Sequence, residues 1–568
     1  MLKQFPPLGK MLLENGLITQ EDLDKALAEQ EKNGQLLGRI LVRDEVVSED
    51  DLLPVLSAQL GIPHVTVKGE KVDPSLIERV PAKYTHHYRF VPLHLEDGTL
   101  SIAIADPLDL QSLDDLSLFL GLKIKPFLGG EKEIEEGLKR YYGIGAETVE
   151  RIISQDETSS DLALPEMAAE DIEDLAQDAS IIKFVNQILL EAFRERATDI
   201  HIEPFQNELR VRYRIDGILY DANVPLNIKY FHRAIVSRIK IMANLNIAER
   251  RLPQDGRVKV KVGHNELDLR ISILPTPFGE TVDIRLLSTS YVLLGLEKLG
   301  LLDKDLSILE SVIKRPHGII LVTGPTGSGK TTSLYSCLSK INKSERKIIT
   351  IEDPIEYQLR GVTQIQVLPK IGLTFAQGLR SMLRHDPDIM MVGEIRDFET
   401  AEIAIQVALT GHLVFSTVHT NDAASTVTRL IDMGVEPYLI SSSVELIIAQ
   451  RLVRLCCPYC KKEVKIEEEF TEEPGIEQLL KKGVVYEGQG CEHCKLTGYR
   501  GRTGIYEFLL VTDRIRDLIL RGVPANKIKE EALAQGMRTL RQDGLEKVEL
   551  GLTSIGEVIR VTQQDAEG

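Results

Sequence analysis

The stretch Ile319-Ile-Leu-Val-Thr-Gly-Pro-Thr-Gly-Ser-Gly-Lys-Thr-Thr332 decides the fold of this chain. Its four leading apolar residues predict a buried strand of a parallel sheet, and residues 333–340 read as a helix. The loop between them fits the pattern G-x-x-x-x-G-K-[ST]. In that pattern backbone N–H groups turn inward on phosphates at the N-terminus of a helix. The sequence therefore predicts a site for a nucleoside triphosphate.

The residue types of this loop suit a triphosphate with a metal ion. Lys330 is placed to reach the β- and γ-phosphates, and the hydroxyl of Thr331 is placed to bind Mg²⁺. The expected ATP-binding set is Gly324, Thr326, Gly327, Ser328, Gly329, Lys330, Thr331 and Thr332. From about residue 298 strands alternate with helices, which predicts a mostly parallel α/β sheet with ligands at the C-terminal ends of its strands.

Bulk composition limits the class of protein. The chain has 568 residues, which suggests about three or four domains, since one core rarely grows so large. Its formal net charge of −18 argues against a general nucleic-acid binder, so no nucleic-acid partner is expected. No apolar run is long enough for a transmembrane helix, and the first residues lack an apolar signal core. We expect a cytoplasmic protein that reaches a membrane only through partners.

The cysteines form a second pattern. Of six cysteines, four lie in two C-x-x-C pairs, Cys457/Cys460 and Cys491/Cys494. In a cytoplasmic chain this spacing favours metal over disulfides, and four thiolates suit a closed tetrahedral Zn²⁺ site. The adjacent Cys456 could substitute for a ligand, but the C-x-x-C spacing selects Cys457. Cys337, on the helix after the phosphate loop, is expected in the core.

The N-terminal region contains an internal repeat. Residues 8–30 recur as residues 37–59, and Thr19 and Ser48 each precede acidic residues and a helical apolar period, as helix caps do. Short strands and helices follow, with a hairpin at Asp97-Gly98. Between residues 155 and 177 there are many acids and no Lys or Arg, which is typical of a flexible tether.

A second domain follows the acidic segment. Residues 181–196 have helical spacing, and residues 209–217 alternate as a strand that places Arg210, Arg212 and Arg214 on one face. Three like charges on one face usually mark a solvated surface, although they could face a phosphate across a domain boundary. Later strands of this domain carry Arg270 and Arg285.

Polar side chains lie at the ends of the strands that follow the phosphate loop. One strand ends in the acidic run Glu352-Asp-Pro-Ile-Glu356, and the strand 389–392 leads to Glu394. His412 and His419 stand at the two ends of a third strand. Cleavage of a triphosphate by water needs charge neutralisation and a positioned water, and a carboxylate can orient or deprotonate that water.

These blocks, taken in order, resemble the secretion ATPase superfamily, whose extension-type members power type II secretion and type IV pilus assembly. The resemblance covers essentially the whole chain. It implies a multidomain α/β protein: a RecA-like P-loop ATPase core, a preceding PAS-like α+β domain, a helical/α+β N-terminal domain and a small zinc-binding insertion. The implied parts are an N-terminal docking or regulatory domain at 1–145, an acidic linker at 146–178, the PAS-like domain at 179–297, the ATPase core at 298–455, the tetracysteine subdomain at 456–503 and a C-terminal helical part of the motor at 504–568.

The same resemblance implies roles for individual residues. An ordinary Walker B strand ends in an acid, but Gly393 occupies that position here, so the catalytic role falls to Glu394 and metal or water positioning to Glu352. His412 and His419 would sense the γ-phosphate. Arginine fingers would come from Arg270 and Arg285, with Arg380 and Arg384 as secondary candidates. Strand-edge polarity and structural salt bridges remain the alternative readings of these residues.

As a whole, the resemblance implies a homo-oligomeric ring, usually a hexamer, that hydrolyses ATP with Mg²⁺ and acts on an inner-membrane platform protein. Extension is favoured over retraction, because retraction motors typically lack both the long N-terminal region and the tetracysteine insertion. Pilus assembly is favoured over type II secretion on the length of that region. A DNA-translocating or conjugation ATPase and a non-hydrolysing nucleotide switch are the further alternatives.

The N-terminal repeat also resembles the paired motifs with which some members of the superfamily bind cyclic di-GMP. Here Pro7 and Leu36 replace the arginine that precedes Leu-Gly in each motif. Loss of both guanidinium groups removes the best partners for guanine. A partner-docking module is therefore favoured over a cyclic di-GMP site.

Overall fold

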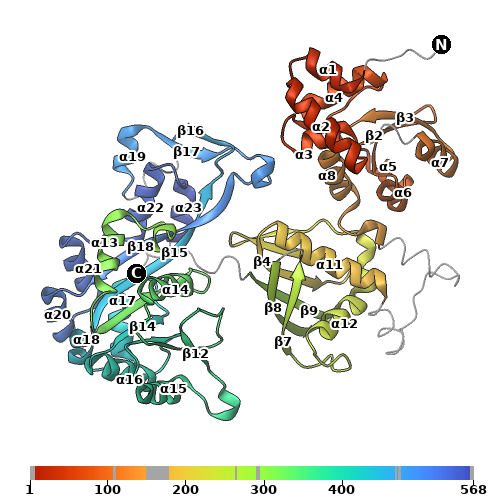
Figure 1. Cartoon of the computed structure of the whole chain (residues 1–568). Coiled ribbons are helices and arrows are strands. Elements are labelled where there is room, and N and C mark those ends of the chain that lie inside the picture. The colour runs from red at the N-terminus through yellow and green to blue at the C-terminus, as the bar shows by residue number, and fades with distance from the viewer. Residues whose placement is uncertain are drawn as a thin grey trace. The chain divides into compact units, whose positions relative to one another are not determined.

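The computed structural model describes residues 7–105, 110–148, 178–262, 265–288, 295–466, 470 and 475–562 (Figure 1). The chain divides into two compact units, the first made of Met1–Val262 and Asp268–Leu286, the second of Gly263–Leu267 and Leu287–Gly568. Nearly all of the expected linker 146–178 lies outside the described residues. Within the described residues, no helix is both long and apolar enough to cross a membrane.

The predicted repeat forms two helical pairs, α1 (Leu8–Glu14) with α2 (Gln20–Asn33) and α3 (Leu37–Arg43) with α4 (Glu49–Leu60). Both expected caps are confirmed: the side chains of Thr19 and Ser48 accept hydrogen bonds from backbone N–H groups one turn into α2 and α4. A Cβ atom at Gly9 would lie 2.5 Å from Leu23 Cδ1, so any side chain there would displace the end of that leucine.

The rest of the N-terminal region packs helices against a three-stranded sheet of order β1-β2-β3. The predicted hairpin is confirmed, because β1 and β2 pair antiparallel across Asp97 and Gly98, which both have positive φ. The elements are α5 (Pro74–Arg79), α6 (Ala82–His87), β1 (Phe90–Glu96), β2 (Thr99–Ile104), α7 (Leu110–Leu120), β3 (Lys123–Leu128) and α8 (Glu131–Tyr142).

Residues 178–288 form an α+β arrangement with a six-stranded sheet of order β6-β5-β4-β9-β8-β7. Each arginine of the predicted stripe has an acidic partner: Arg210 pairs with Glu208, Arg212 with Glu203 and Arg214 with Asp199. The stripe is thus an ion-paired surface. The elements are α11 (Ala179–Arg194), β4 (Ala197–Pro204), β5 (Leu209–Ile215), β6 (Ile218–Asp221), α12 (His232–Met242), β7 (Gln254–Val262), β8 (Asn265–Thr276) and β9 (Gly279–Ser288).

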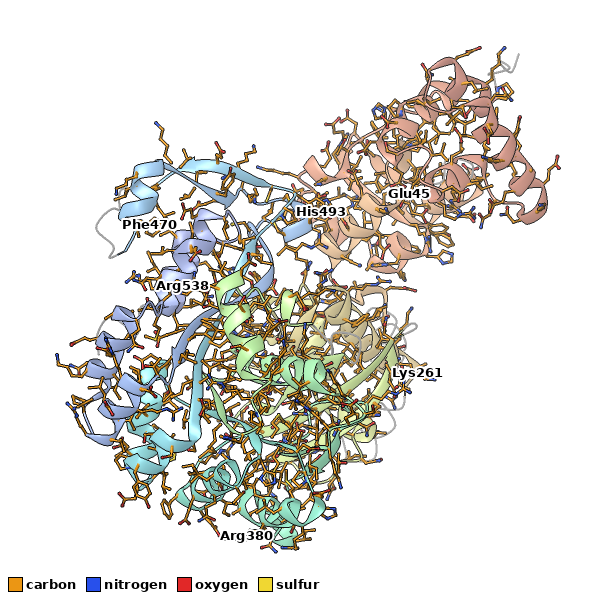
Figure 2. All side chains as sticks on the ribbon, turned by 60° about the vertical axis from the view of Figure 1, so that its left-hand side comes forward. Glu45, Lys261, Arg380, Phe470, His493 and Arg538 are labelled. Carbon is orange, nitrogen blue, oxygen red and sulfur yellow. The ribbon has the colours of Figure 1, made fainter. Side chains whose placement is uncertain are left out.

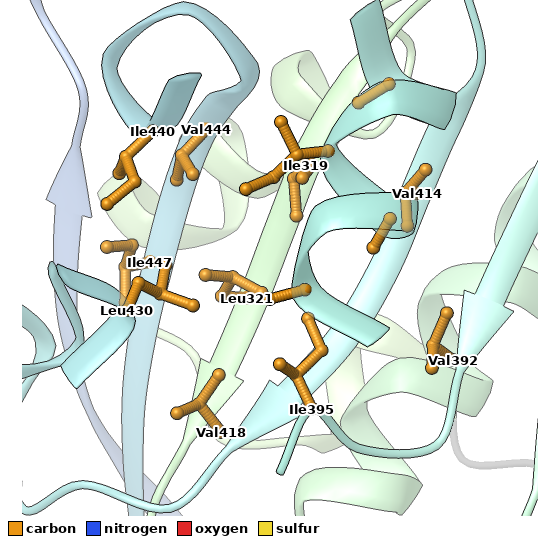
Figure 3. Close-up of a cluster of buried hydrophobic side chains, with 14 of the residues drawn as sticks. Ile319, Leu321, Val392, Ile395, Val414, Val418, Leu430, Ile440, Val444 and Ile447 are labelled. Carbon is orange, nitrogen blue, oxygen red and sulfur yellow. The ribbon is translucent and has the colours of Figure 1, made fainter. Parts of the chain in front are cut away.

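The second unit is built on a seven-stranded sheet of order β12-β11-β13-β14-β10-β15-β18. All neighbouring pairs are parallel except β15 with β18, which confirms the mostly parallel sheet. The strands are β10 (Gly318–Thr323), β11 (Ile348–Glu352), β12 (Thr363–Gln366), β13 (Ile389–Val392), β14 (Leu413–Val418), β15 (Val444–Cys456) and β18 (Tyr499–Leu510). Figure 3 shows Leu321, Val418 and Ile447 of three adjacent strands in one buried apolar cluster.

Helices cover this sheet, and a hairpin of β16 (Lys461–Lys465) and β17 (Val484–Gly488) is inserted between β15 and β18. Of the expected C-terminal helical part, 504–568, residues 504–510 belong to β18, and the helices begin at Asp513. The helices are α13 (Asp303–Val312), α14 (Lys330–Ile341), α15 (Phe375–Met382), α16 (Phe398–Leu409), α17 (Ala423–Asp432), α18 (Pro437–Ser443), α19 (Glu477–Lys482), α20 (Asp513–Leu520), α21 (Ala525–Ala534), α22 (Leu540–Glu549) and α23 (Ile555–Thr562). The short 3₁₀ turns of the described chain are η1 (Val67–Gly69), η2 (Leu226–Phe231), η4 (Leu296–Lys298), η5 (Pro369–Ile371), η6 (Leu383–His385) and η8 (Glu492–Cys494).

Candidate functional site

The phosphate loop joins the end of β10 to the start of α14, as the sequence predicted. Gly327 and Gly329 have φ of 80° and 88°, values that favour glycine. Space requires glycine as well, because a Cβ atom at Gly324 would lie 2.5 Å from the carbonyl oxygen of Gln450. A Cβ atom at Gly329 would lie 2.8 Å from Nε2 of the same glutamine. The backbone of β15 therefore forms a close floor under the loop.

Charge and hydrogen bonding in the loop fit a bound phosphate chain. Lys330 Nζ donates to the carbonyl oxygens of Gly324 and Pro325, at 2.8 and 3.0 Å. Burial lowers the pKa of Lys330 to about 8, an effect that Glu394 opposes and Arg451 reinforces. The hydroxyl of Ser328 is buried and has no hydrogen-bond partner among the described residues. A partly buried cation and an unused donor are what phosphate oxygens require.

The remaining loop residues lie where the motif needs them. Thr326 is exposed at the top of the loop, and Thr331 and Thr332 are half-buried in the first turn of α14. The motif assigns the Thr331 hydroxyl to Mg²⁺, and that role stays a prediction. Mg²⁺, when bound there, would neutralise phosphate charge.

Glu394 lies just beyond β13, at the same edge of the sheet. Thr417 of β14 holds the turn, since its hydroxyl donates to Gly393 O at 2.7 Å and its carbonyl accepts from Ile395 N at 2.9 Å. The Glu394 carboxylate is 12% exposed and forms an ion pair with Arg396. Its other oxygen lies 3.4 Å from His419 Nε2.

His419 follows β14 and completes this group. Burial and the neighbouring Lys330 lower its pKa, while Glu394 opposes the shift, so the imidazole is neutral at pH 7. The structure thus brings together three predicted residues, Lys330, Glu394 and His419. It adds Arg396, to which the sequence analysis assigned no role.

Glu352, the other predicted carboxylate, lies inside the protein. Its side chain is 3% exposed and accepts hydrogen bonds from the hydroxyls of Tyr335 and Thr350. Gln364 Nε2 donates to it at 3.0 Å. Burial and the Glu352 charge raise the pKa of Tyr335, so its phenol remains a donor. In this structure the carboxylate ties α14 and β12 to the end of β11.

A second carboxylate of the same acidic run, Glu356, is half-buried in the loop that follows. Its neighbour Tyr357 packs edge to face on Tyr335 of α14, with ring centroids 4.6 Å apart. Glu356 is thereby placed in a loop that packs against the helix of the phosphate loop. The signal for it in the sequence was its position beyond the end of the strand, whereas Glu352 is the last residue within it.

His412 does not join the other residues. β10 and β14 run parallel, with Gly318 opposite Leu413 and Thr323 opposite Val418. His412 precedes β14, and its carbonyl accepts from Gly318 N at 3.1 Å. It therefore lies at the edge of the sheet opposite the phosphate loop. The expectation that both histidines lie by the γ-phosphate is not met within one chain.

Polar contacts hold Arg285, Arg380 and Arg384. Arg285 on β9 donates from Nε to Asp199 at 2.9 Å, and Arg270 on β8 is half-buried. Both belong to the first unit, so their role at the nucleotide stays a prediction. Arg380 pairs with Glu399 at 2.7 Å, and Arg384 donates to Arg380 O at 3.1 Å.

The four predicted cysteines come together at one end of the β16–β17 hairpin. Their sulfur atoms lie within 4.8 Å of one another, and the Sγ–Sγ distances of Cys457 to Cys491 and of Cys460 to Cys494 are both 3.8 Å. Tetrahedral Zn²⁺ with Zn–S bonds of about 2.3 Å separates its sulfurs by about 3.8 Å, so the cluster fits this ion. Figure 2 shows His493, next to Cys494, and Phe470 at opposite ends of this insertion.

The local backbone favours a thiolate at Cys494, whereas burial raises the pKa of Cys457 and of Cys460. Burial raises the pKa of Cys494, but N–H groups of Cys491 and Gly498 donate to its sulfur and bring the pKa to about 7. Cys456 stays outside the cluster, since its sulfur donates to Tyr486 O at 3.6 Å. Cys337 is buried in the core as expected, and burial raises its pKa to about 12.

Residues 174–560 match the sequence profile described as type II/IV secretion system protein. The chain belongs to the type II/IV secretion system protein family. Its RecA-like core is thus confirmed, and residues 60–148 match the MshEN domain. The chain is 43% identical to the type IV pilus assembly ATPase PilB of Myxococcus xanthus over 565 residues, 98% of this chain and 99% of that protein.

Two further comparisons place this secretion system protein among its relatives. It is 44% identical to type II secretion system protein E of Xanthomonas campestris pv. campestris over 557 residues, 97% of each chain. The structure of the ATPase DotB of Legionella pneumophila matches with a TM-score of 0.51 and 23% identity, over 67% of this chain and 96% of that one. At that identity the likeness concerns the fold alone.

Proposed function

We propose that this secretion system protein is an ATP hydrolase that powers the assembly of type IV pili. The observation that carries the proposal is a phosphate loop with a buried carboxylate at the same sheet edge, in a chain that matches a pilus assembly ATPase over nearly its full length. A nucleotide switch without hydrolysis would not need Glu394 beside Lys330 and His419.

Within the site, Lys330 and Mg²⁺ on Thr331 neutralise the phosphates, and Glu394 orients the attacking water. His419 stands beside Glu394 and responds to the γ-phosphate. The positioning of metal or water at the end of β11 falls to Glu352 as the resemblance implies, or to Glu356, because the oxygens of Glu352 already accept three hydrogen bonds. Arg270 and Arg285 supply guanidinium donors to the transition state.

The experiment is a comparison of three substitutions in the magnesium-loaded oligomer. We expect Glu394→Gln to bind ATP with wild-type affinity but to release phosphate at least about a hundredfold more slowly, because an amide cannot activate water. Glu356→Gln should lower kcat at constant thermal stability if it faces the metal, whereas Glu352→Gln should lower stability through its buried partners. Wild-type turnover in Glu394→Gln would refute the assignment.

A second candidate function is supported by the equally long match to a type II secretion protein. The two relatives do not separate by identity, so deletion of the gene in its own organism is the test. Loss of surface pili supports pilus assembly, and retention of normally secreted enzymes behind the outer membrane supports type II secretion. A DNA-translocating role would require turnover stimulated by DNA, which the acidic charge of −18 does not favour.

The remaining parts of the proposal concern assembly. We expect a hexameric ring that works at the cytoplasmic face of the inner membrane through a platform protein, with residues 1–145 as the docking part and 179–297 as the PAS-like part. Zn²⁺ in the cysteine cluster is structural. Binding of cyclic di-GMP to the N-terminal repeat is not expected, because Pro7 and Leu36 stand in place of arginines; a titration with the nucleotide checks this.

A further inference from the structure

Arg451 is a buried arginine that neither the motif nor the preceding sections assign to the reaction. It lies on β15, which runs parallel to β10 with Ala449 opposite Thr323. The next residues of β15 therefore come beside the first residue of the phosphate loop. A Cβ atom at Gly324 would lie 3.2 Å from Arg451 Nη1, and the residue is 6% exposed. Its guanidinium contacts the loop from the floor.

The same guanidinium also holds the residues 419–422, here called the histidine loop. Nη2 donates to Asn421 O at 3.0 Å, and Nη1 donates to Gln450 O at 3.3 Å. Nη2 thus holds the histidine loop, while Nη1 binds the carbonyl of the preceding residue of β15, whose oxygen lies against Gly324 at the start of the phosphate loop. A lysine ammonium is a single point of charge and could not reproduce that fork.

A second tie joins the same two segments. Thr323, the last residue of β10, accepts from Thr420 N at 2.8 Å, and its hydroxyl lies 2.7 Å from Thr420 Oγ1. The position of His419 beside Glu394 therefore depends on contacts at the base of the phosphate loop. Arg451 is the charged member of these contacts.

The charge of Arg451 connects these contacts to the phosphates. A guanidinium is always protonated, and here it lies near the Lys330 ammonium, whose positive charge it makes less favourable. Phosphates in the loop would offset both charges. Phosphate bound in the phosphate loop therefore favours the arrangement in which Lys330 and Arg451 both stay buried beside the loop.

We propose that Arg451 is a positioning residue of the ATPase, whose guanidinium joins the phosphate loop to the histidine loop so that bound phosphate fixes His419 beside Glu394. The inference rests on the proposed ATP hydrolysis. It adds a physical connection through which binding of phosphate affects the positions of β15 and the histidine loop.

The test compares Arg451→Lys with Arg454→Lys in the full-length oligomer. Arg454 is a matched control, because it lies on the same strand and is largely buried, but it pairs with Glu557. For Arg451→Lys we expect ADP affinity within about threefold of the wild type and kcat lowered at least about tenfold, since charge remains and geometry is lost. Arg454→Lys should keep kcat within about twofold of the wild type.

Hydrogen exchange gives the readout that a merely structural role would not move. ADP should slow exchange in residues 419–422 of the wild type, and this slowing should be lost in Arg451→Lys. Thr323→Val removes the hydrogen bonds to Thr420, so it should also abolish the slowing of exchange by ADP. This variant replaces Arg451→Lys in the test if Arg451→Lys does not fold. Unchanged kcat in Arg451→Lys, or equal loss of affinity, kcat and thermal stability, would overturn the inference. Absence of hydrolysis in the wild type would instead refute the proposed function.

Discussion

At the scale of single residues, the charge of Lys330 sets the pH range in which phosphate binds. Its pKa is lowered to about 8 by burial, and a bound phosphate raises it again, so binding takes up a proton above that pH. ADP affinity should therefore be full below about pH 8 and fall by about tenfold between pH 7.5 and 9. Binding titrations across this range, in buffers of different ionisation enthalpy, measure both the slope and the proton uptake.

The control for this prediction is Lys330→Arg, whose guanidinium does not titrate in that range. Its ADP affinity, even if weaker at every pH, should lose the slope. A slope equal to that of the wild type would assign the titration to a group other than Lys330.

Single residues also show what could be read from the sequence and what could not. Lys330 and the loop glycines were predicted because their chemistry is local to one turn. Glu352 and Glu394 were both predicted as strand-end carboxylates of the site, with different roles, and only the structure shows that Glu352 is buried among hydrogen-bond donors. Glu352 accepts hydrogen bonds from Tyr335, which lies on α14, and from Gln364, which lies on β12. Such distant partners leave no signal in the spacing of the sequence.

At the scale of elements, two adjacent cysteines lie just before the β16–β17 hairpin, and only one of them is expected to bind zinc. Cys457 belongs to the four-sulfur cluster, whereas Cys456 donates to Tyr486 O. We expect about one zinc per chain in the wild type and in Cys456→Ser, but well under one in Cys457→Ser, since a tetrahedral site needs all four thiolates. Elemental analysis of purified protein measures this.

Loss of the metal should also destabilise the hairpin, because binding of structural zinc contributes directly to folding. A chelator should lower the melting midpoint of the wild type. It should leave the midpoint of Cys457→Ser unchanged, because that variant has already lost the metal. Zinc retained in Cys457→Ser but lost in Cys456→Ser would show that the C-x-x-C spacing selects the wrong ligand.

The strand β18 shows why the elements around this hairpin were harder to predict. Residues 504–510 were expected in a helical region. They instead form part of β18 and pair with residues 446–452 of β15, which come before the β16–β17 insertion in the sequence. Pairing at such sequence distance is set by the sheet, not by local propensity. His412 and His419 are separated for a simpler reason: they flank one strand, β14, and an extended strand places its two ends at opposite edges of the sheet.

At the scale of the whole molecule, the proposed mechanism needs an arginine from the first unit at a nucleotide in the second. Arg285 is the sharper candidate, because its side chain is exposed and its Nε donates to Asp199 at 2.9 Å. Arg285→Ala should bind ATP with an affinity within about threefold of the wild type and lose at least about a hundredfold in kcat, as removal of an arginine finger does. Arg212→Ala, on the same sheet and paired with Glu203, is the control that should keep kcat.

Mixing two inactive variants decides which chain Arg285 serves. If Arg285 serves the nucleotide of its own chain, every pocket of a mixed ring is incomplete, because a Glu394→Gln chain lacks the carboxylate and an Arg285→Ala chain lacks the arginine. We therefore expect mixtures of the two variants to stay inactive at every ratio in phosphate-release assays. Mixtures of each variant with wild-type protein serve as the calibration. Recovery of activity, up to a maximum near equal amounts, would instead show that Arg285 completes the pocket of a neighbouring protomer. In that case the pocket would lie between chains.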